Sequence, residues 1–268
     1  MHSPSLSTTG YIGTAAGVRA VIKMAEELKR RNQRLVFVCD PVMGDDGKLY
    51  VNADVVPIYR QIMCIVDVAT PNQFEAETLA SRLITSLPTA LQAVTAIHDL
   101  GPPYVIVTTL SLPDADIPQS LRSFPSASYP SLYCLGSHRP TRAASPHQFL
   151  ITFPAYPGYF TGAGDLFSAL VVARLAEAIE EEHNEIDVGI GAVSDMPPLA
   201  RAVTKVVASV NAVVRRTSEA QRKAGISVGK GQKPDTIEVI RKCELQLVKG
   251  RAEIEKPPLG EEIKIVML

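Results

Sequence analysis

The segment from Phe160 to Ala169, FTGAGDLFSA, carries the strongest chemical signal in the sequence. Gly162 and Gly164, separated by Ala163, allow a tight turn that points several N–H groups at one spot. An apolar helix is predicted to begin there, and the positive end of its dipole favours an anion such as a phosphate. Asp165 could then take the proton from an alcohol that attacks phosphorus. The structural alternative is a turn in which the carboxylate only caps a helix.

A second motif, TPNQFEAE, directly follows a predicted strand. We expect Thr70 to cap a helix, with a proline at the first helical position and Gln73 completing a capping box. That role leaves Asn72 and Glu75 unexplained. Both would project from the carboxyl end of the strand, where open α/β sheets bind their ligands.

A third polar segment, DPVMGD, also follows an apolar run. Its two carboxylates, Asp40 and Asp45, stand beside a glycine at the end of a predicted strand. Hard cations prefer oxygen ligands, so this composition suits a cation–phosphate site. Aspartates that are merely solvated in a polar turn are the alternative.

The composition is that of a globular protein, with 46% hydrophobic and 21% charged residues and a formal net charge of -1. This balance gives no reason to expect nucleic acid or an anionic membrane as a partner. Cys39, Cys64 and Cys134 lie in or beside apolar runs, so we expect reduced, buried thiols. The sequence shows neither a bilayer-spanning run nor the features of a signal peptide, and we expect a soluble intracellular protein.

Strands and helices are predicted to alternate, which indicates βαβ units and a mainly parallel sheet. The fourth and fifth predicted strands, residues 131–135 and 148–153, lie within and just after a Pro- and Ser-rich stretch. We expect them to form an antiparallel hairpin at the sheet edge, where prolines are tolerated. The expected strands cover residues 35–39, 65–69, 104–108, 131–135, 148–153 and 263–267. The expected helices cover residues 17–31, 73–82, 90–100, 165–179, 198–217 and 236–249.

Along the chain, the DPVMGD and TPNQFEAE motifs, the pair Thr108-Thr109 and the FTGAGD turn follow one another in the order found in the pyridoxal kinases of the ribokinase superfamily, which they resemble. The similarity extends from about Thr9 to the C-terminus. The resemblance implies a ribokinase-like three-layer α/β/α sandwich, with one domain over residues 1–268 that is incomplete on its N-terminal side. It also implies transfer of the ATP γ-phosphoryl group to the 5′-hydroxymethyl group of pyridoxal, pyridoxine or pyridoxamine.

By the same resemblance, Asp165 would be the catalytic base and would contact the substrate together with Tyr11. The backbone N–H groups of Gly162, Ala163 and Gly164 would stabilise the phosphoryl group during transfer. Residues expected to bind the nucleotide are Asp40, Tyr50, Asn72, Glu75, Thr108, Thr109 and Gly162. Those expected to hold Mg²⁺ are Asp45, Thr70 and Glu75. The loop at Tyr156-Pro157-Gly158 would lie beside the adenine. A monovalent cation, K⁺ or Na⁺, would assist, and the intact enzyme would be a cytoplasmic homodimer, also found in the nucleus.

Pyridoxal kinases open with a strand and a substrate-binding segment that have no counterpart here. We therefore expect a truncated chain with weak or no activity, because orienting a reacting group can lower a barrier by about 7–11 kcal/mol. Two alternatives remain open. Hydroxymethylpyrimidine kinases have similar motifs but typically carry Cys where this chain has Asp165. The other alternative is an inactive nucleotide-binding product.

Overall fold

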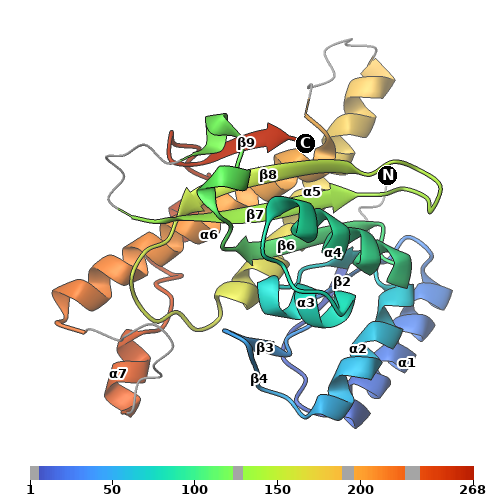
Figure 1. Cartoon of the computed structure of the whole chain (residues 1–268), viewed down its shortest axis with the longest axis horizontal. Helices are drawn as coiled ribbons and strands as arrows, with labels where there is room; N and C mark the ends of the chain where they lie inside the picture. Colours follow the sequence, from blue (N-terminus) through green and yellow to red (C-terminus); the bar gives the residue numbers. More distant parts are fainter. Residues whose placement is uncertain (1–5, 123–128, 189–195, 227–235) are drawn as a thin grey trace.

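The computed structural model describes residues 6–122, 129–188, 196–226 and 236–268. Its centre is a seven-stranded sheet in the order β1-β2-β5-β6-β7-β8-β9, and a separate two-stranded hairpin is formed by β3 and β4 (Figure 1). The strands are β1 (Leu6–Thr9), β2 (Val36–Cys39), β3 (Gly44–Asp45), β4 (Lys48–Leu49), β5 (Val68–Ala69), β6 (Tyr104–Leu110), β7 (Ser131–His138), β8 (His147–Pro154) and β9 (Lys264–Met267).

Helices cover both faces of the sheet, which gives the expected three layers. The α-helices are α1 (Ala15–Arg31), α2 (Val56–Ile62), α3 (Gln73–Ala80), α4 (Leu87–Leu100), α5 (Ala163–Val188), α6 (Pro198–Lys223), α7 (Ile237–Lys242) and α8 (Arg251–Glu255). Among the described residues, no helix is long and apolar enough to cross a membrane.

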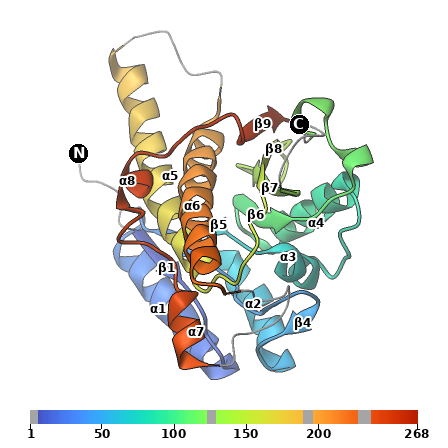
Figure 2. The same cartoon turned by 90° about the vertical axis from the view of Figure 1, so that its left-hand side faces the viewer.

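Two hydrophobic cores hold the layers together. One packs α1–α4 against one face of the sheet, and the other packs α5 and α6 against the opposite face (Figures 1 and 2). Strand β2 serves both cores, because Phe37 and Cys39 belong to the first and Val38 to the second. Successive side chains of a strand point to opposite faces, so a strand buried on both sides must be apolar throughout.

The sheet is parallel in one half and antiparallel in the other. Strands β1, β2, β5 and β6 run parallel, whereas β7, β8 and β9 each pair antiparallel to their neighbour. The carboxyl ends of the parallel strands therefore meet at the edge where β8 also ends, since Ser131 at the start of β7 pairs with Pro154. All three sequence motifs follow strands that end at this edge.

The structure changes several predicted elements. The hairpin of β7 and β8 is confirmed but lies inside the sheet, because β9 pairs with β8 and takes the edge. The strand predicted at 65–69 is reduced to two residues, since the Asp67 carboxylate accepts the N–H of Phe37 at 2.7 Å and also binds Lys29. The strand at 6–9 was not expected from the sequence.

Other differences lie toward the C-terminus and at one cysteine. The helix predicted at 165–179 begins earlier and extends to Val188. The helix predicted at 236–249 ends at Lys242, because the following chain turns toward α6, where Gln246 N–H donates to Thr217 Oγ1 at 3.1 Å. Cys39 and Cys134 are buried as expected, but Cys64 is exposed.

Candidate active site

The turn at the start of α5 has the conformation expected of an anion-binding turn. Gly162 has a φ of +84°, which favours glycine, and its carbonyl oxygen accepts from the N–H of Leu166 at 3.0 Å. The helix begins at Ala163, and the N–H groups of its first turn have no partner within the helix. Asp165 is exposed at this end, and a methyl group on Gly10 would lie 2.8 Å from its Oδ1. The predicted base therefore stands at the carboxyl end of β1.

Asp40 faces this turn from the end of β2. It is 5% exposed, and a methyl group on Gly164 would lie 3.4 Å from its Oδ2. Burial raises the pKa of Asp40 to about 7, and the negative charge of Asp165 adds to the rise, while a hydrogen bond with Ser168 opposes it. The charge of Asp165 therefore reaches Asp40 across the glycine turn.

Thr70 does not cap α3, contrary to the prediction. Its hydroxyl shares a hydrogen bond with Ser168 Oγ at 2.9 Å and donates to the carbonyl oxygen of Cys39 at 3.4 Å. Ser168 comes from the first turns of α5, so this pair ties the phosphate turn to the ends of β2 and β5. The predicted metal ligand at residue 70 is therefore a buried link between layers in this structure.

The capping box at α3 is formed by Asn72 and Glu75 instead. Asn72 Oδ1 accepts from the N–H of Glu75 at 2.9 Å, and Glu75 Oε2 accepts from the N–H of Asn72 at 2.9 Å. Gln73, the predicted partner, uses its amide to accept from Ser111 N–H and to donate to the Ile84 carbonyl. The capping box shifts by two residues because Thr70 is already engaged.

Glu75 also reaches the DPVMGD segment. Its Oε1 accepts from the N–H of Met43 at 2.9 Å, and Asn72 Nδ2 donates to the carbonyl of Gly44 at 2.8 Å. Glu75 is 3% exposed, and burial raises its pKa to about 8, an effect that the N–H donors partly offset. The start of α3 therefore holds the hairpin of β3 and β4 in place.

This hairpin presents two predicted site residues to the solvent. Asp45 is exposed, and its Oδ1 accepts from the N–H of Asp46 at 2.8 Å. Tyr50 is half exposed, and its backbone N–H donates to the carbonyl of Met43 at 2.8 Å. Partial burial raises the pKa of Tyr50, and the charges of Asp45 and Asp46 and the nearby Tyr159 contribute. The hairpin thus approaches the segment that leads into α5.

The sequence is similar to a family of known kinases. A family model described as phosphomethylpyrimidine kinase matches residues 4–123. The pyridoxal kinases of Arabidopsis thaliana and Homo sapiens are 30% and 31% identical to this chain, over 93% and 94% of its length and 67% and 72% of theirs. This chain belongs to the pyridoxal kinase family.

A solved pyridoxal kinase, that of Leishmania donovani in complex with ADP and pyridoxamine, has the same fold. It superposes with a TM-score of 0.70 at 29% identity, covering 98% of this chain and 74% of that one. The ribokinase-like architecture expected from the motifs is therefore confirmed.

The remaining predicted contacts lie around the same edge. Thr108 and Thr109 lie near the end of β6, where its register with β7 shifts, and the N–H of Thr108 donates to the carbonyl of Pro71 at 2.9 Å. The Thr109 side chain is exposed. Tyr11 is 61% exposed and folds back so far that a methyl group on Gly13 would lie 2.8 Å from its hydroxyl.

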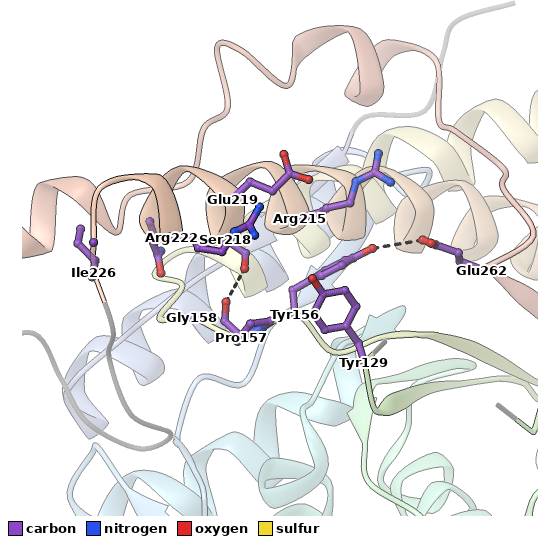
Figure 3. A pocket seen from close by; sticks show the side chains of 12 residues that line it. Tyr129, Tyr156, Pro157, Gly158, Arg215, Ser218, Glu219, Arg222, Ile226 and Glu262 are labelled. Atoms are coloured by element: carbon purple, nitrogen blue, oxygen red, sulfur yellow. Dashed lines mark hydrogen bonds between the residues drawn. The ribbon is translucent and has the colours of Figure 1, made fainter. Parts of the chain in front are cut away.

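A cavity of about 530 Å³ opens beside the segment between β8 and α5 (Figure 3). Tyr156 and Pro157 form one wall, and α6 forms another through Arg215 and Ser218. The Tyr156 hydroxyl donates to Glu262 Oε2 at 3.2 Å. The loop from Tyr156 to Gly158, which is expected beside the adenine, thus lines this cavity.

The residues fit a divalent cation only as a shared site. Among the described residues, no group of three or more His, Cys, Asp or Glu side chains could hold a metal ion alone. Asp45 is exposed and its Oδ1 accepts the N–H of Asp46, while both oxygens of Glu75 accept N–H groups. A Mg²⁺ ion would therefore need phosphate oxygens and water as further ligands, which is its usual mode in nucleotide sites.

Two residues of the site escaped sequence reasoning. Ser168 bridges Asp40 and Thr70, and its spacing of three from Asp165 on one helix was the signal that could have revealed it. Tyr59 is fully buried, and within the described chain its hydroxyl has no hydrogen-bond partner. Burial raises its pKa, with smaller contributions from Cys39 and Asp40. Nothing local in the sequence marks this tyrosine.

Proposed function

We propose that the chain transfers the γ-phosphoryl group of ATP to the 5′-hydroxymethyl group of pyridoxal, pyridoxine or pyridoxamine. The observation that carries the proposal is the placement of Asp165 at the head of α5, beside a left-handed glycine turn and opposite the buried Asp40. The L. donovani relative, described with ADP and pyridoxamine, supports both substrate classes.

In the proposed reaction, the exposed Asp165 carboxylate accepts the proton of the attacking hydroxymethyl group. The N–H groups from Gly162 to Gly164 hold the phosphoryl oxygens, and the positive end of α5 favours the negative charge. Asp40 lies beside Gly164 of this turn, so its ionised carboxylate would repel a bound phosphoryl group. A divalent cation held at this site would neutralise that repulsion and the charge on the phosphates.

The divalent cation would be Mg²⁺. Asp45 would bind it directly, and Asp40 and Glu75 would bind it through water. A monovalent cation, K⁺ or Na⁺, would assist at the same edge. The nucleotide would extend over Tyr50 and the Thr108–Thr109 pair, with its base at the Tyr156–Gly158 loop.

We extend the proposal to a single-domain cytoplasmic homodimer. Analytical ultracentrifugation would report the dimer, and one cooperative unfolding transition would support one domain.

Phosphorylation of a hydroxymethylpyrimidine is the second candidate, favoured by the description of the family model that matches residues 4–123. The presence of Asp165 in the glycine turn argues for the B6 vitamers, because the resemblance places Cys there in hydroxymethylpyrimidine kinases.

The test measures ADP formation with Mg²⁺ and ATP against a panel of pyridoxal, pyridoxine, pyridoxamine and hydroxymethylpyrimidine. We expect B6-dependent turnover that falls by about 10²–10⁴-fold in Asp165→Asn, with ADP binding retained. Turnover only with hydroxymethylpyrimidine would favour the second candidate. ADP binding without any turnover would favour an inactive nucleotide-binding protein. The measured rate also tests the expectation of weak activity.

A further inference from the structure

Two buried polar side chains of α6 fasten the segment between β8 and α5, residues 155–162. The Ser218 hydroxyl donates to the carbonyl oxygen of Pro157 at 2.6 Å, and the two groups face each other in Figure 3. Gln221 brackets Tyr159, because its Oε1 accepts the Tyr159 N–H at 3.3 Å and its Nε2 donates to the Tyr159 carbonyl at 2.8 Å. The two side chains are 9% and 2% exposed.

The backbone between these anchors approaches α6 closely. Gly158 has a φ of +142°, and a methyl group there would lie 2.6 Å from Gln221 Oε1. Because an amide side chain offers a donor and an acceptor like those of a peptide, Gln221 pairs with the segment as a neighbouring strand would. Three hydrogen bonds and a close glycine contact therefore define the position of this segment.

The anchored segment continues into the phosphate turn. Gly162 lies three residues after Tyr159, and three residues of chain span at most about 10 Å. A shift of the anchor would therefore reach the turn through only three residues of chain. At its other end the segment lines the cavity through Tyr156. The Tyr156 ring packs edge-to-face on Tyr129, with 4.9 Å between the ring centroids.

We propose that Ser218 and Gln221 are positioning residues for the phosphoryl donor, a nucleoside triphosphate, and for the diphosphate that it leaves. They set the separation between the cavity wall and the Gly162 turn, which must match the distance between base and terminal phosphates. Neither residue touches the reacting atoms. This inference rests on the proposed kinase function for the identity of the donor.

The test replaces Gln221 by methionine, which keeps the length of the side chain and removes both hydrogen bonds to Tyr159. We expect the Kd for ADP, measured by calorimetry, and the KM for ATP to rise by about tenfold, since two hydrogen bonds are lost. The KM for pyridoxal should not change. Ser218→Ala removes one bond and should give a smaller rise in the same two constants. Gln61→Met, the same change at an exposed position of α2, is the control.

Unchanged ADP and ATP constants in folded Gln221→Met would overturn the inference, even if its melting temperature fell, because the contacts would then serve stability alone. If Gln221→Met does not fold, Ser218→Ala and Gln221→Glu decide the question by the same constants; the glutamate retains an acceptor for the Tyr159 N–H. A weaker ADP affinity in a chain that phosphorylates no B6 vitamer would uphold this inference and reject the proposed function.

Discussion

Asn72 and Glu75 each accept the backbone N–H of the other at 2.9 Å, so two residues predicted to bind nucleotide and metal also begin α3. Glu75 further accepts the N–H of Met43 from the β3–β4 side. The same carboxyl group therefore serves both helix capping and the placement of the β3–β4 hairpin. Substitutions here should affect folding as well as activity.

Glu75→Gln should lower the free energy of unfolding by about 1–3 kcal/mol. Both carboxylate oxygens accept N–H groups, so the amide NH₂ of glutamine must face one buried donor and leave it unpaired. Urea denaturation measures the loss, and Glu26→Gln on the exposed side of α1 is the matched control. Equal stabilities of Glu75→Gln and the unaltered protein would show that the N–H groups find other partners.

Gly10→Ala should lower kcat by up to about 10²-fold with little change in stability. The added methyl group would lie 2.8 Å from Asp165 Oδ1, and the exposed carboxylate would move away from its working position. Steady-state kinetics with pyridoxal and ATP measure the effect. Gly260→Ala, where a methyl group meets nothing within 4 Å, should keep its kcat. A normal kcat in Gly10→Ala would contradict the placement of the base.

Gly162→Ala should cost about 1 kcal/mol of stability and weaken ADP binding. Its φ of +84° is strained for alanine, and relief of the strain would turn the N–H groups away from the phosphate. Gly164→Ala offers the comparison, because its methyl group would meet Asp40 Oδ2 at an ordinary 3.4 Å. Thermal melting and ADP calorimetry on both variants check the difference. Equal melting temperatures would argue against strain at Gly162.

His98 should make the fold acid-sensitive. Its ring is 2% exposed and bonded to the Pro102 carbonyl and the Ser137 hydroxyl, and burial lowers its pKa from 6.5 to about 4. Between these values the unfolded chain binds a proton that the folded protein does not. Stability from this group is therefore complete above pH 6.5 and declines as the pH falls toward 4, by at most about 1.4 kcal/mol per pH unit.

Urea unfolding at a series of pH values measures this slope. His98→Gln should flatten it between pH 6.5 and 4, although the variant is expected to be less stable at neutral pH. His147→Gln, at the exposed start of β8, should retain the slope of the unaltered protein. A slope that survives in His98→Gln would place the acid-sensitive group elsewhere.

The sequence by itself determined the alternation of strands and helices in the first half of the chain and the places where polar motifs follow strands. Apolar runs such as 35–39 and 104–108 became β2 and β6, because burial on both faces requires an apolar residue at every position. The glycine turn before Asp165 could be predicted because its conformation depends on residues that are adjacent in the chain. The motifs at 40–45 and 70–77 could be placed at one edge of the sheet, since parallel strands share their carboxyl ends.

Only the tertiary structure decided which side chains pair across long distances. The hydroxyl of Thr70, the predicted helix cap, instead bonds to Ser168, 98 residues away, and Asn72 forms the capping box of α3. The hairpin of β7 and β8 became interior because β9 returned from the end of the chain. Gln221 bonds to Tyr159 across 62 residues of sequence. Such contacts follow from packing the layers, and local propensity and spacing contain no information about them.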